Sequence, residues 1–132
     1  ILIDSLGGEV QAGLYIIDLI QASNKPVYTV CLSKAYSMGA IILSAGNIRY
    51  ALSHSKVMIH EPRIQKTGGS ATSIQKTAED IMDTKKSLVD ILAKYTKQST
   101  KQIEKAISFD NYMDTEAAIK FGIIDKTLNN LN

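Results

Sequence analysis

The sequence predicts a layered α/β domain, and three observations lead to this prediction. Short runs rich in β-branched and aliphatic residues alternate along the chain with apolar residues at three- and four-residue spacing. Glycine or proline stands at several boundaries between these runs. The 132 residues are enough for one domain with a real core, and few for two. Alternating strands and helices imply parallel strand pairing through right-handed crossovers.

The first half of the chain predicts two helices among four strands. The glycine pair Gly7-Gly8 separates the first strand from a helix with one apolar stripe, formed by Val10, Leu14, Ile17 and Ile20. Gly46 would stop the second helix, which Ser37 opens. Cys31 alternates with its neighbours in a strand and is expected in the core. We expect strands over residues 1–3, 27–32, 48–52 and 56–60, and helices over residues 10–22 and 37–45.

The second half predicts one long helix and two short ones. The long helix covers residues 72–97, with Thr72 and Gln75 spaced as a capping box. Its apolar residues form a narrow stripe of Ile74, Ala78, Ile81, Leu88, Leu92 and Tyr95. The helix therefore either covers the domain or projects from it. Shorter helices follow over residues 101–107 and 115–121. Asp114 is the expected N-cap of the last helix, and Gly122 its stop.

Composition and motifs exclude several functions. The net charge of +2, without a basic cluster bearing aromatics, argues against nucleic acid binding. No apolar stretch approaches the length of a membrane span. The glycines do not form a dinucleotide or phosphate-loop motif, and no His, Cys or carboxylate spacing indicates a metal. We therefore expect no cofactor. The single cysteine fits a reducing compartment.

Ser37 is the candidate nucleophile. It lies where a strand pattern gives way to a helix pattern, and such a junction directs a serine hydroxyl outward at the start of a helix. The following Gly39 and Ala40 are small, so another chain could approach the hydroxyl closely. Gly7 and Gly8, which follow an earlier strand, offer further N–H donors. Together these residues predict a nucleophile with an oxyanion hole.

Only two histidines could serve as the base. His54 lies in a polar turn between two strands. His60 ends a buried strand that Pro62 prevents from continuing, and a histidine at a strand end can be held as a general base. The alternative is a histidine that caps a core strand through a satisfied hydrogen bond. Gly8, Ser37 and His60 all follow strand ends, as a shared site requires.

Several motifs in order resemble the family of the proteolytic subunit of the Clp protease. They are Asp4-Ser5-Leu6-Gly7-Gly8, Tyr36-Ser37-Met38-Gly39-Ala40, Val57-Met58-Ile59-His60-Glu61-Pro62, and the stretch from Thr115 to Asp125. The resemblance covers nearly the whole chain and implies the spiral α/β fold shared with crotonases, with a projecting handle helix. It implies a serine endopeptidase with Ser37, His60 and Asp110 as the catalytic residues. Composition alone does not single out Asp110.

The resemblance also implies the remaining site residues and the partners. The backbone N–H groups of Gly8 and Met38 match the oxyanion hole, and Val10, Pro62 and Arg63 flank the extended substrate. Residues 1–132 would be one domain with residues 63–97 as the handle, and the domain's N-terminal part would be missing. The family assembles into rings, for example two stacked heptamers, and works with an AAA+ unfoldase of the Clp type on unfolded polypeptides. Its members act in the cytoplasm or in an organelle interior such as the plastid stroma.

The chain departs from the family pattern at several positions. Leu6 replaces a proline, Glu61 a glutamine and Arg63 a leucine. Ser108 and Phe109 replace a charged pair that links ring stacking to the catalytic aspartate, so stacking would need other contacts. Arg63 and the handle lysines are the candidates to replace those charges. Two alternatives stay open: a non-catalytic or weakly active paralogue that fills ring positions, and an acyl-CoA enzyme of the crotonase type.

Overall fold

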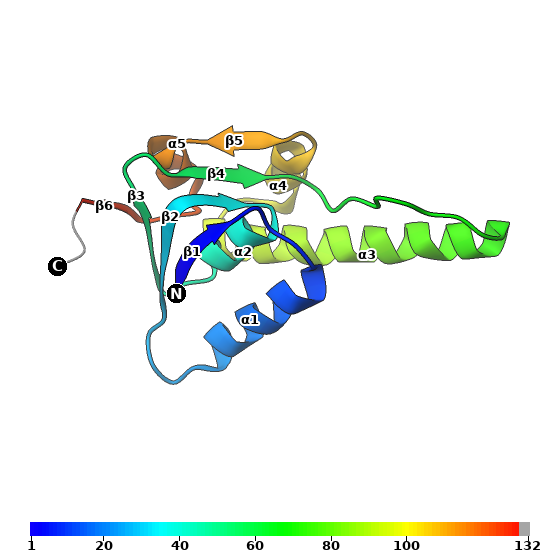
Figure 1. The fold of residues 1–132 in the computed structure, drawn as a ribbon, viewed down its shortest axis with the longest axis horizontal. Coiled ribbons are helices and arrows are strands. Elements are labelled where there is room, and N and C mark those ends of the chain that lie inside the picture. Colours follow the sequence, from blue (N-terminus) through cyan, green and yellow to red (C-terminus); the bar gives the residue numbers. More distant parts are fainter. Residues whose placement is uncertain (130–132) are drawn as a thin grey trace.

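One long strand, β2 (Tyr28–Tyr36), organises the sheet in the computed structural model, which describes residues 1–129. It pairs in parallel with β1 (Leu2–Ser5) on one side, from Val30 to Ala35 with a shift of register. On the other side, its first half pairs in parallel with β3 (Ile48–Leu52). Its last residues pair in parallel with β4 (Lys56–Ile59). The sheet curls because β2 changes partner along its length, from β3 to β4. The predicted α/β fold is confirmed, and Figure 1 shows the curled sheet with its helices.

The other elements extend the sheet and cover it. Two more strands give the order β5-β4-β2-β3-β6, with β1 paired to β2. β5 is antiparallel to β4, the exception to the expected parallel pairing. The remaining elements are α1 (Val10–Ala22), α2 (Met38–Ser44), α3 (Ala71–Thr96), α4 (Thr100–Ile107), β5 (Asn111–Met113), α5 (Thr115–Phe121) and β6 (Lys126–Leu128).

The core surrounds α2. Six of its seven residues are buried, and it packs against β2, α1 and α3. Cys31 of β2 is fully buried, as expected for a core residue, and burial raises the pKa of its thiol. Because α2 is largely buried, the residue that precedes it is held firmly. Among residues 1–129, no helix combines the length and the apolar character that a bilayer span requires.

The long helix α3 projects beyond the sheet, and the segment after β4 leads to its far end (Figure 1). Its buried residues all lie in the last third of the helix: Leu88, Val89, Leu92 and Thr96. Ile74, near the start of the apolar stripe, is 44% exposed. The predicted capping box was wrong. Ser70 caps the helix by accepting the N–H of Ser73, so Thr72 is already helical.

Two further boundaries differ from the sequence prediction. β2 is four residues longer than expected at its C-terminal end, since residues 34–36 pair with β4. Gly46 is not a left-handed stop: α2 ends at Ser44, its C-cap Ala45 is right-handed, and Gly46 does not have a positive φ. A Cβ at Gly46 would lie 2.4 Å from Thr29 Oγ1, so close packing explains this glycine. Asp114 and Gly122 do cap and stop α5 as predicted.

Arg49 ties the C-terminal elements to the sheet. Its guanidinium bonds both carboxylate oxygens of Asp125, at 2.6 and 3.0 Å. It also donates to the carbonyl oxygens of Gly122 and Tyr95, at 2.8 and 3.1 Å. The hydrogen bonds from Arg49 hold the pKa of Asp125 below its ordinary value. Arg49 therefore joins β3, the end of α3 and the α5–β6 connection.

Asp125→Asn should lower the free energy of unfolding at neutral pH by about 1–2 kcal/mol, because a charge-assisted pair is lost. The native carboxylate has a lowered pKa, so its stabilisation is complete above the ordinary value and is lost as the pH falls through the lower folded-state value. Urea denaturation at a series of pH values should show the two proteins converging in acid. Asp80→Asn, in the exposed pair with Lys76, is the control and should change stability little. If the difference in free energy of unfolding between wild type and Asp125→Asn stayed constant into acid, the Asp125 carboxylate would not be the source of the stabilisation.

Candidate active site

Ser37 connects β2 to α2 in a strained conformation. Its φ and ψ are 55° and −121°, a region that residues with a side chain rarely adopt. Its N–H donates to the carbonyl of Met58 at 2.8 Å, which fixes it to β4. A serine before a helix ordinarily caps it, but the hydroxyl of Ser37 accepts no N–H of α2. The hydroxyl is therefore directed away from the helix.

The hydroxyl of Ser37 meets His60. The Ser37 Oγ to His60 Nε2 distance is 2.8 Å, and the hydroxyl and the imidazole are half-buried. Parallel pairing of Tyr36 with Met58 brings the ends of β2 and β4 together, so the residues that follow both strands are neighbours. If Nε2 accepts the serine proton, Nδ1 carries the other hydrogen and must donate it. His54, in contrast, is exposed in the turn between β3 and β4.

Asp110 receives that second hydrogen bond. Its Oδ1 lies 3.2 Å from His60 Nδ1. Asp110 directly precedes β5, and the antiparallel pairing of Ile59 with Asn111 places it opposite His60. The carbonyl of Ile107 accepts the N–H of Glu61 at 2.9 Å, which anchors the end of α4 to the same segment. Three side chains far apart in the sequence thus form one line of hydrogen bonds.

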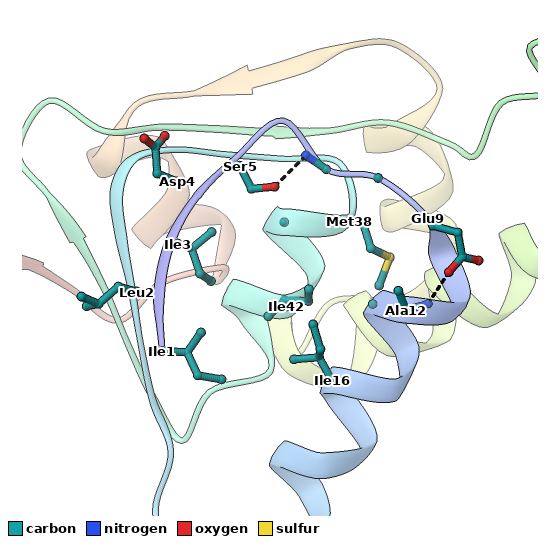
Figure 2. A pocket seen from close by; sticks show the side chains of 14 residues that line it. Ile1, Leu2, Ile3, Asp4, Ser5, Glu9, Ala12, Ile16, Met38 and Ile42 are labelled. Carbon is teal, nitrogen blue, oxygen red and sulfur yellow. Dashed lines mark hydrogen bonds between the residues drawn. The ribbon is translucent and has the colours of Figure 1, made fainter.

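The glycine turn lies against the backbone of this site. A Cβ at Gly7 would fall 2.8 Å from Ser37 Cβ and 3.2 Å from the amide nitrogen of Met38, and the φ of Gly7 is 97°. Only glycine fits this position without displacement. Figure 2 shows the turn held by Ser5, whose hydroxyl accepts the Gly7 N–H at 3.0 Å, and by Glu9, which caps α1. Within residues 1–129, the N–H groups of Gly8 and Met38 donate to no backbone carbonyl.

A pocket of about 340 Å³ lies behind the glycine turn, between β1, α1 and α2. Figure 2 shows Met38 and Ile42 of α2 beside Ala12 and Ile16 of α1 in this pocket. It shares Gly7, Gly8 and Met38 with the site, while Ser37 and His60 lie outside its lining. The hydrogen-bonded line is therefore separate from this pocket.

The residues expected to flank a substrate come from two different parts of the chain. Val10 is the first residue of α1, and Pro62 lies in the segment that follows β4. Arg63 follows Pro62 and donates through its guanidinium to Asp110 Oδ1, the oxygen that also faces His60. The sequence indicates that Arg63 is an unusual charge near the site, but it does not predict the contact of Arg63 with Asp110. Within the described chain, no group of three or more His, Cys, Asp or Glu side chains could hold a metal ion.

This arrangement has the parts that acyl transfer requires. A hydroxyl is bonded to an imidazole, and the imidazole is oriented by a carboxylate. The N–H of Met38, the residue after Ser37, and that of Gly8, next to the glycine packed on Ser37, could receive a developing oxyanion. A comparison with protein families matches residues 1–130 to the family described as Clp protease. The match spans nearly the whole chain and includes all of the residues that form the site.

Proposed function

Since this chain belongs to the Clp protease family, we propose that it is a serine endopeptidase subunit that hydrolyses peptide bonds of unfolded proteins inside a self-assembled chamber. The observation that supports the catalytic part is the hydrogen-bonded line from Ser37 through His60 to Asp110. The fold and the family alone would be compatible with an inactive subunit. The proposal includes an AAA+ unfoldase of the Clp type as a partner, and a cytoplasmic or organellar location.

The reaction would proceed in two steps. Ser37 Oγ attacks the peptide carbonyl carbon while His60 Nε2 takes its proton, and the carbonyl oxygen becomes an oxyanion. The N–H groups of Gly8 and Met38 stabilise that charge, and the loss of one such donor typically costs about 3–4 kcal/mol. His60 then gives the proton to the leaving amine, and an acyl ester forms on Ser37. Water, deprotonated by the same imidazole, releases the acid.

Asp110 would keep the imidazole in the required tautomer. Its hydrogen bond from Nδ1 leaves Nε2 free to accept from Ser37, and its charge stabilises the imidazolium. An extended substrate would lie along the surface in front of the glycine turn, between residues 8–10 and residues 62–64. Pairing with main-chain groups explains how sequences of many kinds could be accepted.

One observation favours the alternative of a non-catalytic paralogue. Ser108 and Phe109 stand where the resemblance expects a charged pair, and Phe109 is 57% exposed. The contact of Ser37 with His60 opposes this alternative, because a subunit without catalytic function has no use for a strained serine bonded to a histidine. A crotonase-type enzyme likewise has no need for this pair.

A fluorophosphonate probe should label Ser37, because the activated hydroxyl displaces fluoride from phosphorus. Labelling should vanish in Ser37→Ala and fall by roughly 10³-fold or more in His60→Ala, as expected for members of a triad. His54→Ala is the matched control, since that histidine is exposed in a distant turn, and it should react at the wild-type rate. Labelling can be followed by intact-protein mass spectrometry. A folded protein that stays unlabelled would favour the non-catalytic paralogue.

The chamber is tested by sedimentation velocity. If the chain self-assembles into rings, the protein at micromolar concentration should sediment as a species many times the 14.4 kDa chain mass. The exposed first two thirds of α3 offer a surface for contacts between copies, because the buried residues of this helix all lie in its last third. A monomer under these conditions would contradict the chamber, even if Ser37 were reactive.

A further inference from the structure

One oxygen of Asp110 receives two donors from the same short segment. Oδ1 lies 3.2 Å from His60 Nδ1 and also accepts the guanidinium of Arg63, three residues further along. We propose that Arg63 is a positioning residue that holds the Asp110 carboxylate in the orientation that His60 requires. This inference rests on the proposed peptidase function and departs from the expectation that Arg63 flanks the substrate.

Asp110 needs such a restraint because of its location. It lies in the short connection between α4 and β5, and its side chain is 41% exposed. The rotation of an exposed carboxylate about its last torsion is only weakly restricted. Phe109, just before it, points largely into solvent. The single hydrogen bond to His60 would therefore leave the carboxylate loosely oriented.

Arg63 is suited to this task by its chemistry and by its anchoring. A guanidinium presents several N–H donors in one rigid plane, which fixes a carboxylate better than a single donor does. The segment that carries Arg63 is itself fixed by Glu61. The Glu61 N–H donates to the carbonyl of Ile107 at 2.9 Å, and this main-chain bond supplies the anchoring. The pair between the Glu61 carboxylate and Lys85 of α3 is partly exposed and adds little to it. The segment between His60 and Arg63 is therefore bonded to the end of α4.

The charge of Arg63 also has an opposing effect. A guanidinium on Asp110 neutralises part of the carboxylate charge and so weakens its stabilisation of the imidazolium. With Arg63 60% exposed and Asp110 41% exposed, solvent screens this effect strongly. Solvent cannot orient the carboxylate. The positioning effect of Arg63 on the reaction rate is therefore larger than the opposing effect of its charge. Removal of Arg63 should slow the reaction and should not accelerate it.

Two reagents distinguish a positioning role of Arg63 from a substrate-binding role. A small alkyl fluorophosphonate needs an activated Ser37 and an oxyanion hole, and it offers no peptide side chains for Arg63 to contact. A fluorogenic peptide amide needs both catalysis and binding along the surface. A positioning residue affects the inactivation rate constant and kcat, whereas a substrate-binding residue raises the KM for the peptide and leaves the small probe unaffected.

We expect Arg63→Leu to lower both the inactivation rate constant and kcat by roughly 10- to 100-fold, with KM within about two-fold, since small displacements of catalytic groups have effects of this size. Arg63→Lys should recover part of the loss, because its ammonium can still donate to Asp110. Lys85→Gln breaks the neighbouring ion pair without touching Asp110, and it should stay within about two-fold of wild type. Circular dichroism should show all three variants folded.

Three outcomes would overturn the positioning role of Arg63. They are a wild-type or faster inactivation rate in Arg63→Leu, a change confined to KM, and an equal loss in Lys85→Gln. The last would mean that immobilising the segment matters and that the contact with Asp110 does not. A wild-type protein that reacts with neither reagent would instead contradict the proposed function, and this inference with it.

Discussion

The pairing of three strand ends at one edge of the sheet is the constraint on which the rest of the structure depends. β2 runs parallel to β4, and β5 returns antiparallel to β4, so the residues beside these ends are forced together. The hydrogen bond from Ser37 N–H to the carbonyl of Met58 joins the first two strands at the point where Ser37 must be placed. Main-chain pairing therefore brings His60 into contact with both Ser37 and Asp110, which lie far from it in the sequence.

Backbone strain at Ser37 is sustained by packing around it. A non-glycine residue in such a conformation costs of order 1–3 kcal/mol, and it persists only where the surroundings determine it. The buried α2 on one side and the Gly7 turn on the other supply that determination, since a Cβ at Gly7 would collide with Ser37. Within residues 1–129, the N–H groups of Gly8 and Met38 beside this packing donate to no backbone carbonyl. The strained serine, the glycine turn and the two amides therefore depend on the same local packing.

Local signals made much of this fold predictable, and long-range contacts account for what was missed. The bounds of α1 and α5 follow from apolar periodicity and, for α5, from Asp114 and Gly122, which act within one turn of the helix. The last residues of β2 could not be assigned, because Lys34, Ala35 and Tyr36 are extended only through pairing with β4. The role of Gly46 was misjudged since its packing against Thr29 is not visible in a short window. The cap of α3 was placed at Thr72 although Ser70, which accepts the N–H of Ser73, is an equally local signal. Ser37 and His60 could be selected from their positions at strand ends, whereas Asp110 required the family resemblance, and the contact of Arg63 with Asp110 required the structure.

The structure of the protein after reaction with a fluorophosphonate would show whether Ser37, His60 and the two amides act together. We expect phosphorus bonded to Ser37 Oγ, with the phosphoryl oxygen accepting hydrogen bonds from the N–H groups of Gly8 and Met38. We also expect that His60 still lies between Ser37 and Asp110. A phosphoryl oxygen directed away from both amides, or an imidazole turned away from Asp110 in the adduct, would contradict the proposed catalytic arrangement.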